Sequence, residues 1–290
     1  YISPNSFHNY MKRLLLLLPA IALATAGLFA QDLPSYDPNS IDVPYKKFVL
    51  PNGLRLIVHE DHKAPIVAVN VWYHVGSKNE KPGKSGFAHL FEHLMFNGSE
   101  HFNTDYFQAL EAIGGTDLNG TTNEDRTNYF QNVPVGALDQ VLWLESDRML
   151  SLAFTPKSLE VQRQVVIEEF KQRYLNQPYG DVWLLLKPLA YKVHPYQWNT
   201  IGKEISHIEN ATMDEVKDFF KKFYHPANAI MVVAGPIELE KVKEWSQKWF
   251  GTIPAQFKDQ RNLPAEPAQT EARKLVVYRD VPANSIYKAW

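Results

Sequence analysis

The sequence contains no cysteine, so disulfide bonds and thiolate metal sites are excluded. A metal ion could be held only by histidine, aspartate or glutamate, a set of ligands that suits several divalent ions. An excess of positive charge is also absent, because 30 lysine and arginine residues stand against 32 acidic ones, for a net charge of −2. No basic stripe stands out, and nucleic acid is therefore not expected as a partner. Neither a phosphate-binding glycine loop nor a serine nucleophile elbow is present.

The first 30 residues have the pattern of an export signal. A basic pair at residues 12–13 precedes the apolar run Leu14–Phe29, which is followed by the small residue Ala30. A transmembrane anchor is the alternative, but the run is short for a bilayer span of about 20 residues, and Pro19 interrupts it. We therefore predict that residues 1–30 are upstream residues plus a signal peptide. The mature chain is then exported, periplasmic or secreted, with no stable membrane span after cleavage.

Residues 31–45 are rich in Pro, Asp and Ser and predict an extended lead-in, after which residues 46–250 mix β-patterned and helical stretches. An Asn-Gly pair at residues 52–53 is a strong hairpin signal. Strands are expected at Lys47–Leu50, Leu54–His59, Ile66–Val75, Thr116–Thr122, Thr127–Asn132 and Ala229–Ala234. Helices are expected at Phe87–Phe96, 105–113, Val135–Leu152, Pro156–Tyr174, Asp181–Tyr191, Thr212–Phe223 and Glu238–Phe250. Because no parallel crossover unit repeats, this order favours an α+β domain over a doubly wound sheet.

The composition changes after residue 250. Residues 251–273 are rich in Pro, Ala, Gln and charged residues and have no sustained apolar period, so we predict a linker. New strands are expected at Leu275–Tyr278 and Ile286–Trp290. Residues 274–290 are too few to bury a core of their own, and we interpret them as the start of a truncated second domain.

The most informative stretch is the pentapeptide from His89 to His93, with Glu92 inside it. On a helix, positions i and i+4 lie one turn apart on one face, so both imidazoles can reach one ion. Glu92 projects to the same side and can accept a proton from a metal-bound water, whose pKa zinc lowers toward about 7. Two histidines placed on a polar helix face by chance are the alternative, with a frequency on the order of a few per cent per chain. We therefore predict a catalytic metal site with Glu92 as its general base.

A third protein ligand is needed, because catalytic zinc keeps three and leaves one position open. The best downstream candidates are the adjacent carboxylates Glu168 and Glu169, which lie within an apolar helical stretch. Neighbouring helical residues are turned by about 100° from each other, so only one of the two can face the ion. Helix geometry by itself leaves the choice open.

These motifs resemble the inverzincin peptidases of family M16, the group of pitrilysin and insulin-degrading enzyme. Their motif is His-x-x-Glu-His, with a third glutamate ligand about 76 residues beyond the second histidine, which here selects Glu169. The resemblance covers most of residues 45–250. It includes Gly114-Gly115, the run Asn119-Gly120-Thr121-Thr122, Asn176-Gln177-Pro178-Tyr179-Gly180 and His194-Pro195-Tyr196.

The resemblance implies one zinc ion per chain, held by His89, His93 and Glu169, and a fold of α+β halves, each with an antiparallel sheet packed by helices. It also implies that the strand carrying Asn119, Gly120 and Thr121 pairs with an extended peptide, main chain to main chain. Such pairing favours peptides or unfolded proteins as substrates. Asn119 would help to orient the scissile carbonyl, or it is simply a turn or edge-strand residue.

Two departures from the family leave alternatives open. Many relatives carry a glutamate seven residues before the third ligand, where this chain has Gln162, which adds no charge near the metal. The family's second half supplies part of the substrate chamber, whereas this sequence ends at Trp290. The chain is therefore expected to be an exported zinc endopeptidase or oligopeptidase, a fragment that needs a second half or partner subunit, or a non-catalytic binding or assembly subunit of the same fold. Substrate, cleavage specificity and the metal used in vivo stay open.

Overall fold

The computed structural model describes residues 42–255 and 262–290. Its strands are β1 (Lys46–Val49), β2 (Arg55–Glu60), β3 (Ile66–Tyr73), β4 (Thr116–Thr122), β5 (Thr127–Pro134) and β6 (Ala229–Gly235). Its helices are α2 (Phe87–Leu94), α3 (Tyr106–Ala112), α4 (Leu138–Leu150), α5 (Pro156–Phe170), α6 (Val182–Ala190), α7 (Ile205–Glu209), α8 (Met213–Phe223) and α9 (Leu239–Phe250). The signal predicted over residues 1–30 and most of the lead-in predicted over residues 31–45 lie outside the described residues.

The six strands form one sheet in the order β1-β2-β6-β3-β5-β4. Four of the five pairings are antiparallel, and the pairing of β2 with β6 is parallel. The predicted α+β class is therefore confirmed, and the sheet is mixed rather than wholly antiparallel. Strand β4 stands at one edge of the sheet, so one side of its backbone has no neighbouring strand among the described residues.

The predicted hairpin at residues 51–53 is confirmed, and it joins β1 to β2. Gly53 has a φ of +90°, a value that glycine adopts without a steric cost. The buried side-chain amide of Asn52 donates hydrogen bonds to the carbonyl oxygens of Phe250 (2.7 Å) and Ile253 (3.0 Å). The turn is thereby tied to the C-terminal end of α9.

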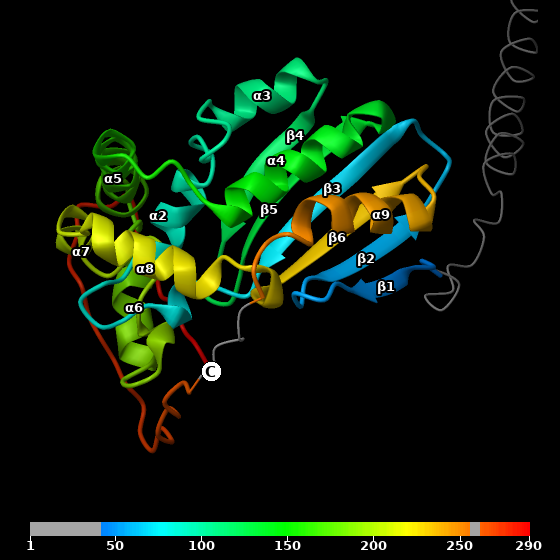
Figure 1. Cartoon of the computed structure of the whole chain (residues 1–290). Coiled ribbons are helices and arrows are strands. Elements are labelled where there is room, and N and C mark those ends of the chain that lie inside the picture. The colour runs from blue at the N-terminus through cyan, green and yellow to red at the C-terminus, as the bar shows by residue number, and fades with distance from the viewer. Residues whose placement is uncertain (1–41, 256–261) are drawn as a thin grey trace, which may run out of the picture. The chain divides into compact units, whose positions relative to one another are not determined.

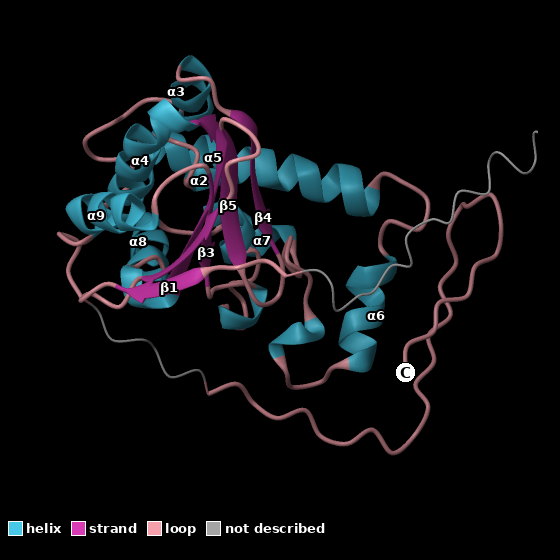
Figure 2. Ribbon diagram, turned by 90° about the vertical axis from the view of Figure 1, so that its right-hand side faces the viewer, coloured by secondary structure: helices cyan, strands magenta, loops and turns pink. Residues whose placement is uncertain are grey.

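Helices cover one face of the sheet (Figures 1 and 2). In β3, Val67, Val69, Val71 and Tyr73 are buried, while residues between them, such as Trp72, are more exposed. This alternation is what a strand with one covered face requires. Figure 1 shows α4 and α9 running across that face, and α5, α7 and α8 gathered with α2 beyond its left end.

Helix α2 is held by contacts with the sheet and with two other helices. It touches β4 and β5 on one side and packs against α5 and α8 on the others. Its Phe91 is fully buried and stacks on Phe219 of α8, with ring centroids 5.2 Å apart. The short helix that carries the histidine motif is therefore fixed in the core.

Two predicted strands are wrong. The strands predicted at Leu275–Tyr278 and Ile286–Trp290 are not formed: these residues run without regular structure, and Val276 and Ile286 are 57% and 83% exposed. A strand needs a neighbour to accept its hydrogen bonds, and no described strand pairs with either segment. The helix predicted over Pro156–Tyr174 is confirmed: it is an α-helix to Phe170 and continues as one π-helical turn, Lys171–Leu175.

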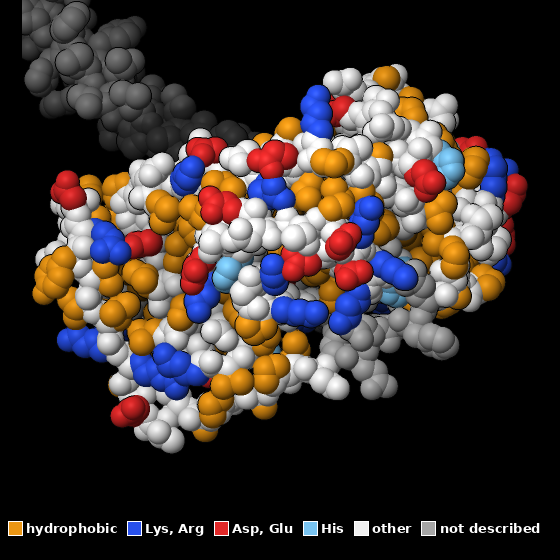
Figure 3. All heavy atoms as spheres, turned by 60° about the vertical axis from the view of Figure 1, so that its left-hand side comes forward, with side chains coloured by type: hydrophobic (Ala, Val, Ile, Leu, Met, Phe, Trp, Pro, Cys, Tyr) orange, Lys and Arg blue, Asp and Glu red, His pale blue; other side chains and the backbone are white. Residues whose placement is uncertain are grey.

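Acidic and basic side chains are interspersed on the molecular face drawn in Figure 3. Within residues 42–255 and 262–290, no helix combines the length and the apolar character needed to cross a membrane.

Candidate metal centre

Helix α2 presents His89 and His93 on the same side. Its apolar residues Phe87, Leu90, Phe91 and Leu94 are buried in the core, which leaves the polar positions on the opposite face. The two imidazole rings lie 4.8 Å apart between centroids and nearly perpendicular, at 89°. Their side chains are 12% and 22% exposed, so both are partly shielded and still reachable from solvent.

Glu169 comes to the two histidines from α5. Its Oε2 lies 3.6 Å from Nε2 of His89 and 3.4 Å from Nε2 of His93. The neighbouring Glu168 turns away, with its side chain 57% exposed and paired with Lys171 at 2.6 Å. Of the two adjacent carboxylates, the structure therefore brings Glu169 to the histidines and leaves Glu168 on the surface.

The three side chains fit a tetrahedral zinc ion. Two ligands bonded at 2.0–2.1 Å in tetrahedral geometry lie about 3.3 Å apart, close to the separations of 3.4 and 3.6 Å found here. Two imidazole nitrogens and one carboxylate oxygen are also a donor set found in catalytic zinc sites. Among the described residues, this is the one group of at least three His, Asp or Glu side chains close enough to hold a metal.

The protonation of the group also suits a metal. Burial lowers the pKa of His89 to about 4, so its ring is neutral at pH 7 and has a free lone pair. Its buried Nδ1 has no hydrogen-bond partner among the described residues. For Glu169, burial raises the pKa, but the hydrogen bond to His93 and the charges nearby outweigh burial, and the pKa falls below its usual value. Glu169 is therefore a carboxylate at neutral pH.

Glu92 lies on α2 between the two histidines, and a residue of the sheet holds its side chain in place. Its Oε2 accepts a hydrogen bond from the hydroxyl of Thr122, at the end of β4. Burial raises the pKa of Glu92, and the Thr122 hydrogen bond acts in the opposite direction. A carboxylate in this position, with its pKa moved toward neutrality, is suited to accept and release a proton.

Strand β4 runs past Glu92, and of its three predicted substrate-binding residues only Gly120 packs against the site. The ideal Cβ position of Gly120 is 3.1 Å from Cγ of Glu92. The side chain of Asn119 instead accepts a hydrogen bond from the N–H of Gly120 at 2.9 Å, and the hydroxyl of Thr121 bonds to Asn128. The alternation of a strand sends residues 119 and 121 to the face opposite from residues 120 and 122.

Two contacts at the site were not predicted from the sequence. Thr122 is the hydrogen-bond partner of Glu92, and Arg173 forms an ion pair with Glu169, with Nη1 3.0 Å from Oε1. Arg173 is 70% exposed and stands four residues after Glu169, a spacing that is a known signal for ion pairs on helices. Nothing in the local sequence signals the contact of Thr122, because it joins residues 30 apart in the chain.

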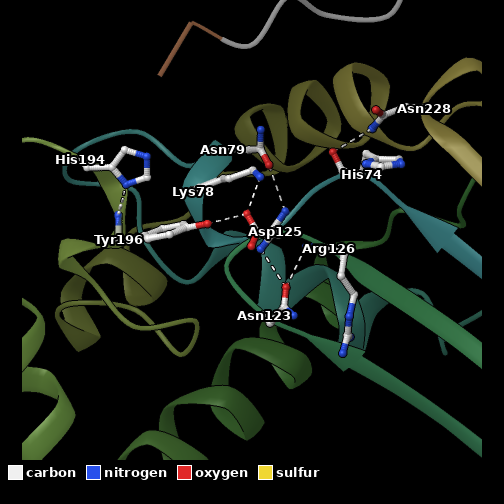
Figure 4. A network of polar contacts seen from close by, with 10 residues as sticks. His74, Lys78, Asn79, Asn123, Asp125, Arg126, His194, Tyr196 and Asn228 are labelled. Carbon is white, nitrogen blue, oxygen red and sulfur yellow. Dashed lines mark hydrogen bonds and ion pairs between the residues drawn. The ribbon is translucent and has the colours of Figure 1, made fainter. Parts of the chain in front are cut away.

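The turn after β4 is anchored by polar contacts (Figure 4). Asp125 accepts hydrogen bonds from the ammonium of Lys78 and from the hydroxyl of Tyr196, the latter at 2.8 Å. The side-chain oxygen of Asn123 accepts from the backbone N–H groups of Asp125 and Arg126 at 2.8 and 2.9 Å. These contacts fix the turn that follows Thr122.

Comparisons with known proteins agree with this arrangement. Residues 55–195 match the family described as insulinase (peptidase family M16), and residues 210–290 match the family described as peptidase M16 inactive domain. The chain is 35% identical over 278 residues to the zinc protease PqqE of Helicobacter pylori, covering 94% of this chain and 60% of that protein.

Solved structures show the same fold. The crystal structure of a protease from Helicobacter pylori matches with a TM-score of 0.76 at 34% identity, over 82% of this chain and 57% of that one. The periplasmic protease PqqL from Escherichia coli matches with a TM-score of 0.71 at 23% identity, over 79% of this chain and 26% of that one. This chain thus spans well under two thirds of the length of these relatives. The motif, the sheet with its helices and both matched regions agree, and the chain belongs to the M16 family of peptidases.

Proposed function

We propose that this chain is an exported zinc metallopeptidase that hydrolyses extended peptides, with His89, His93 and Glu169 as metal ligands and Glu92 as general base. One observation carries the proposal: Oε2 of Glu169, from α5, lies 3.6 and 3.4 Å from the Nε2 atoms of His89 and His93, on α2, as ligands of one tetrahedral ion would. Relatives named zinc proteases support the choice of metal.

The chain's own residues divide the chemistry between them. Zinc, when bound, supplies a Lewis acid that makes a water molecule acidic near neutral pH and polarises a carbonyl group. Glu92 takes the proton of the attacking water and passes it to the leaving amine. Thr122 holds Glu92 in place by its hydrogen bond, and Arg173 occupies the second oxygen of Glu169, so that the first oxygen faces the histidines.

An extended peptide is the substrate that the fold suits. Strand β4 is at the edge of the sheet and passes directly beside Glu92 through Gly120 and Thr122. A peptide added to this edge by main-chain pairing would lie along the metal site, with specificity set by pockets for alternate side chains. Asn119, Gly120 and Thr121 are accordingly proposed as substrate-binding residues. Folded proteins offer few free strands, so peptides and unfolded chains are favoured.

We place the catalytic domain at residues 46–250, the linker at residues 251–273 and the start of a second domain at residues 274–290. Residues 210–290 match the family's inactive domain, and the relatives are longer than this chain. A second M16-like half or a partner subunit is therefore proposed to complete the substrate chamber. Export is supported by the N-terminal sequence, and one structural relative is named a periplasmic protease.

The test compares the full chain with its Glu92→Gln variant, measuring bound zinc and cleavage of a quenched peptide library. About one zinc per chain in both proteins, with cleavage by the parent alone, is the expected result. Glu168→Gln is the matched control: it makes the same chemical change on an exposed residue and should keep both zinc and activity.

Each other outcome has a definite meaning. Absence of zinc from the parent refutes the metal centre. Zinc in both proteins and cleavage by neither refutes peptidase activity of this chain alone. That result favours a fragment that needs a second half or partner subunit, ahead of a binding or assembly subunit, which the intact Glu92 opposes.

A further inference from the structure

Helix α2 begins at a residue that cannot cap it with a side chain. Gly86 precedes the helix with a φ of +90°, a conformation that favours glycine. A Cβ there would lie 2.9 Å from the carbonyl oxygen of Ile201 and 2.5 Å from a methyl group of Ile208. Ser, Thr, Asp and Asn at this position bind the free N–H groups of the first turn through their side chains, which glycine cannot do. In α2 those groups need a partner from elsewhere.

Glu80 supplies that partner. Its Oε2 accepts a hydrogen bond from the N–H of Gly86 at 2.9 Å, and its Oε1 accepts one from the N–H of Ala88, also at 2.9 Å. The residue is only 6% exposed. Among the described residues, no lysine, arginine or histidine forms an ion pair with Glu80, so backbone N–H groups are its main partners.

The contact acts through the two oxygens of the acid rather than through a full negative charge. Burial raises the pKa of Glu80 to about 8, against hydrogen bonds from Ala88, Gly86, Trp198 and Phe87 that lower it, so the acid is largely neutral at pH 7. The two backbone hydrogen bonds at 2.9 Å are therefore what joins it to the first turn. Burying an acidic side chain without a cation lowers the stability of the fold. The hydrogen bonds to the first turn of α2 offset this cost and explain why Glu80 is buried here.

What Glu80 holds is the start of the metal-binding helix. Ala88 immediately precedes His89, and α2 has only eight residues, so loosening its first turn moves His89 relative to His93 and Glu169. A helix of two turns has little stability of its own, and its ends depend on external contacts.

The same segment also reaches the strand that supports Glu92. Just before Glu80, the N–H groups of Ser77 and Lys78 donate to the carbonyl oxygens of Asn123 and Glu124 at 3.1 and 3.0 Å. Figure 4 shows the side chain of Lys78 extending to Asp125 in the same turn. Residues 77–80 therefore join the first turn of α2 to the turn that directly follows Thr122.

We infer that Glu80 is a positioning residue of the metal centre: its two side-chain oxygens fix the first turn of α2, so that His89 and His93 lie beside Glu169 in the geometry that binds zinc. The inference rests on the proposed function, which it deepens by assigning a role to a residue that touches neither the metal nor the substrate.

The test is Glu80→Gln in the full chain, because glutamine keeps the volume and one acceptor oxygen but replaces the second acceptor oxygen by an NH₂ group that can only donate. We expect zinc affinity, measured by competition with a chelator, to fall about tenfold, as is usual for residues that orient metal ligands. The absorption bands of Co²⁺ bound in place of zinc should also shift, because they report the geometry of the ligands. Glu80→Ala should have a larger effect on both readouts.

Thr212→Ala is the matched control, because Thr212 caps α8, which carries no proposed ligand. It should lower the unfolding temperature of the metal-free protein while leaving zinc affinity and the Co²⁺ bands unchanged. If Glu80→Gln behaves in the same way as this control, Glu80 only stabilises the fold and the inference is overturned. If the parent itself binds no zinc, the proposed function fails and the inference fails with it, so the two failures can be told apart.

Discussion

Replacing Gly120 by alanine tests how closely strand β4 supports the proposed general base. Gly120 is buried beneath α2, and an added Cβ would lie 3.1 Å from Cγ of Glu92 and 3.0 Å from the ring of Phe96. Both distances are shorter than the 3.4 Å at which ordinary van der Waals contact begins. One or both side chains must therefore move when the methyl group is present.

The size of the effect follows from these distances. To restore an ordinary contact, the Glu92 side chain has to withdraw by about 0.3 Å, since cores do not absorb extra methyl groups without shifts. Because a misplacement of about 1 Å can cost about 100-fold in rate, we expect kcat to fall about fourfold to tenfold in Gly120→Ala. Overpacking should also lower stability by about 1–3 kcal/mol. Zinc affinity should stay within about twofold of the parent, because the atoms nearest to the added methyl group belong to Glu92 and Phe96 and not to a proposed ligand.

The assay measures kcat on a quenched peptide, zinc affinity by chelator competition, and the unfolding temperature. Gly136→Ala is the control, because in the described part of the chain no heavy atom lies within 4 Å of the Cβ that it adds. It should leave kcat unchanged. It should also raise the free energy of unfolding by about 0.4–1 kcal/mol, because alanine lowers the conformational entropy of the unfolded chain.

An unchanged kcat together with a lower unfolding temperature would refute the reasoning, because it would show that Phe96 alone absorbs the methyl group and that Glu92 does not depend on β4. A loss of zinc affinity as large as the loss of rate would refute it in another way, by showing that β4 supports the ligands rather than the base.

Two further predictions concern other parts of the structure. Glu169→Gln should weaken zinc binding, measured by chelator competition, by more than about 100-fold, because that is the upper end of the loss for residues that only support a ligand. Glu168→Gln should leave zinc binding unchanged. Equal effects of the two variants would contradict the assignment of Glu169 as the ligand. His101 donates a hydrogen bond from Nδ1 to the buried carboxylate of Asp147, which raises the pKa of His101 above 6.5. The contribution of this pair to stability is fully present below pH 6.5 and is lost as the pH rises through the raised pKa. His101→Gln should therefore flatten the fall in unfolding temperature between pH 6 and pH 8, and an unaltered pH dependence would contradict it.

Patterns local in sequence predicted most of the elements. The Asn-Gly turn, the alternation of Ile66–Val75 and the capping threonine at residue 212 are signals that act over a few residues, and the structure agrees with each. The histidine pair is local in the same sense, because an i, i+4 spacing brings both rings to one face.

Contacts between segments distant in sequence were beyond such patterns. Helix geometry left Glu168 and Glu169 as equal candidates, and only the packing of α5 on α2 brings one of them to the histidines. Thr122 and Glu80 have no sequence signal at all, because their roles come from what the fold places beside them. The strands predicted at 275–278 and 286–290 fail for the same reason: propensity marks a segment that can pair, and pairing requires a neighbour.

The exposure of the centre bears on whether zinc binding and peptide cleavage need the same parts of the protein. Every proposed ligand and the base lie within residues 46–250, so affinity for zinc is expected of this region alone. The open side of the centre is different: His93 is 22% exposed, and Arg173, which holds Glu169, is 70% exposed. Electrostatic stabilisation of a transition state is strongest where water is excluded. A second half that covers the centre is therefore expected to raise kcat much more than it raises zinc affinity. This chain alone would then bind zinc well and cleave peptides slowly, and the completed protein would do both.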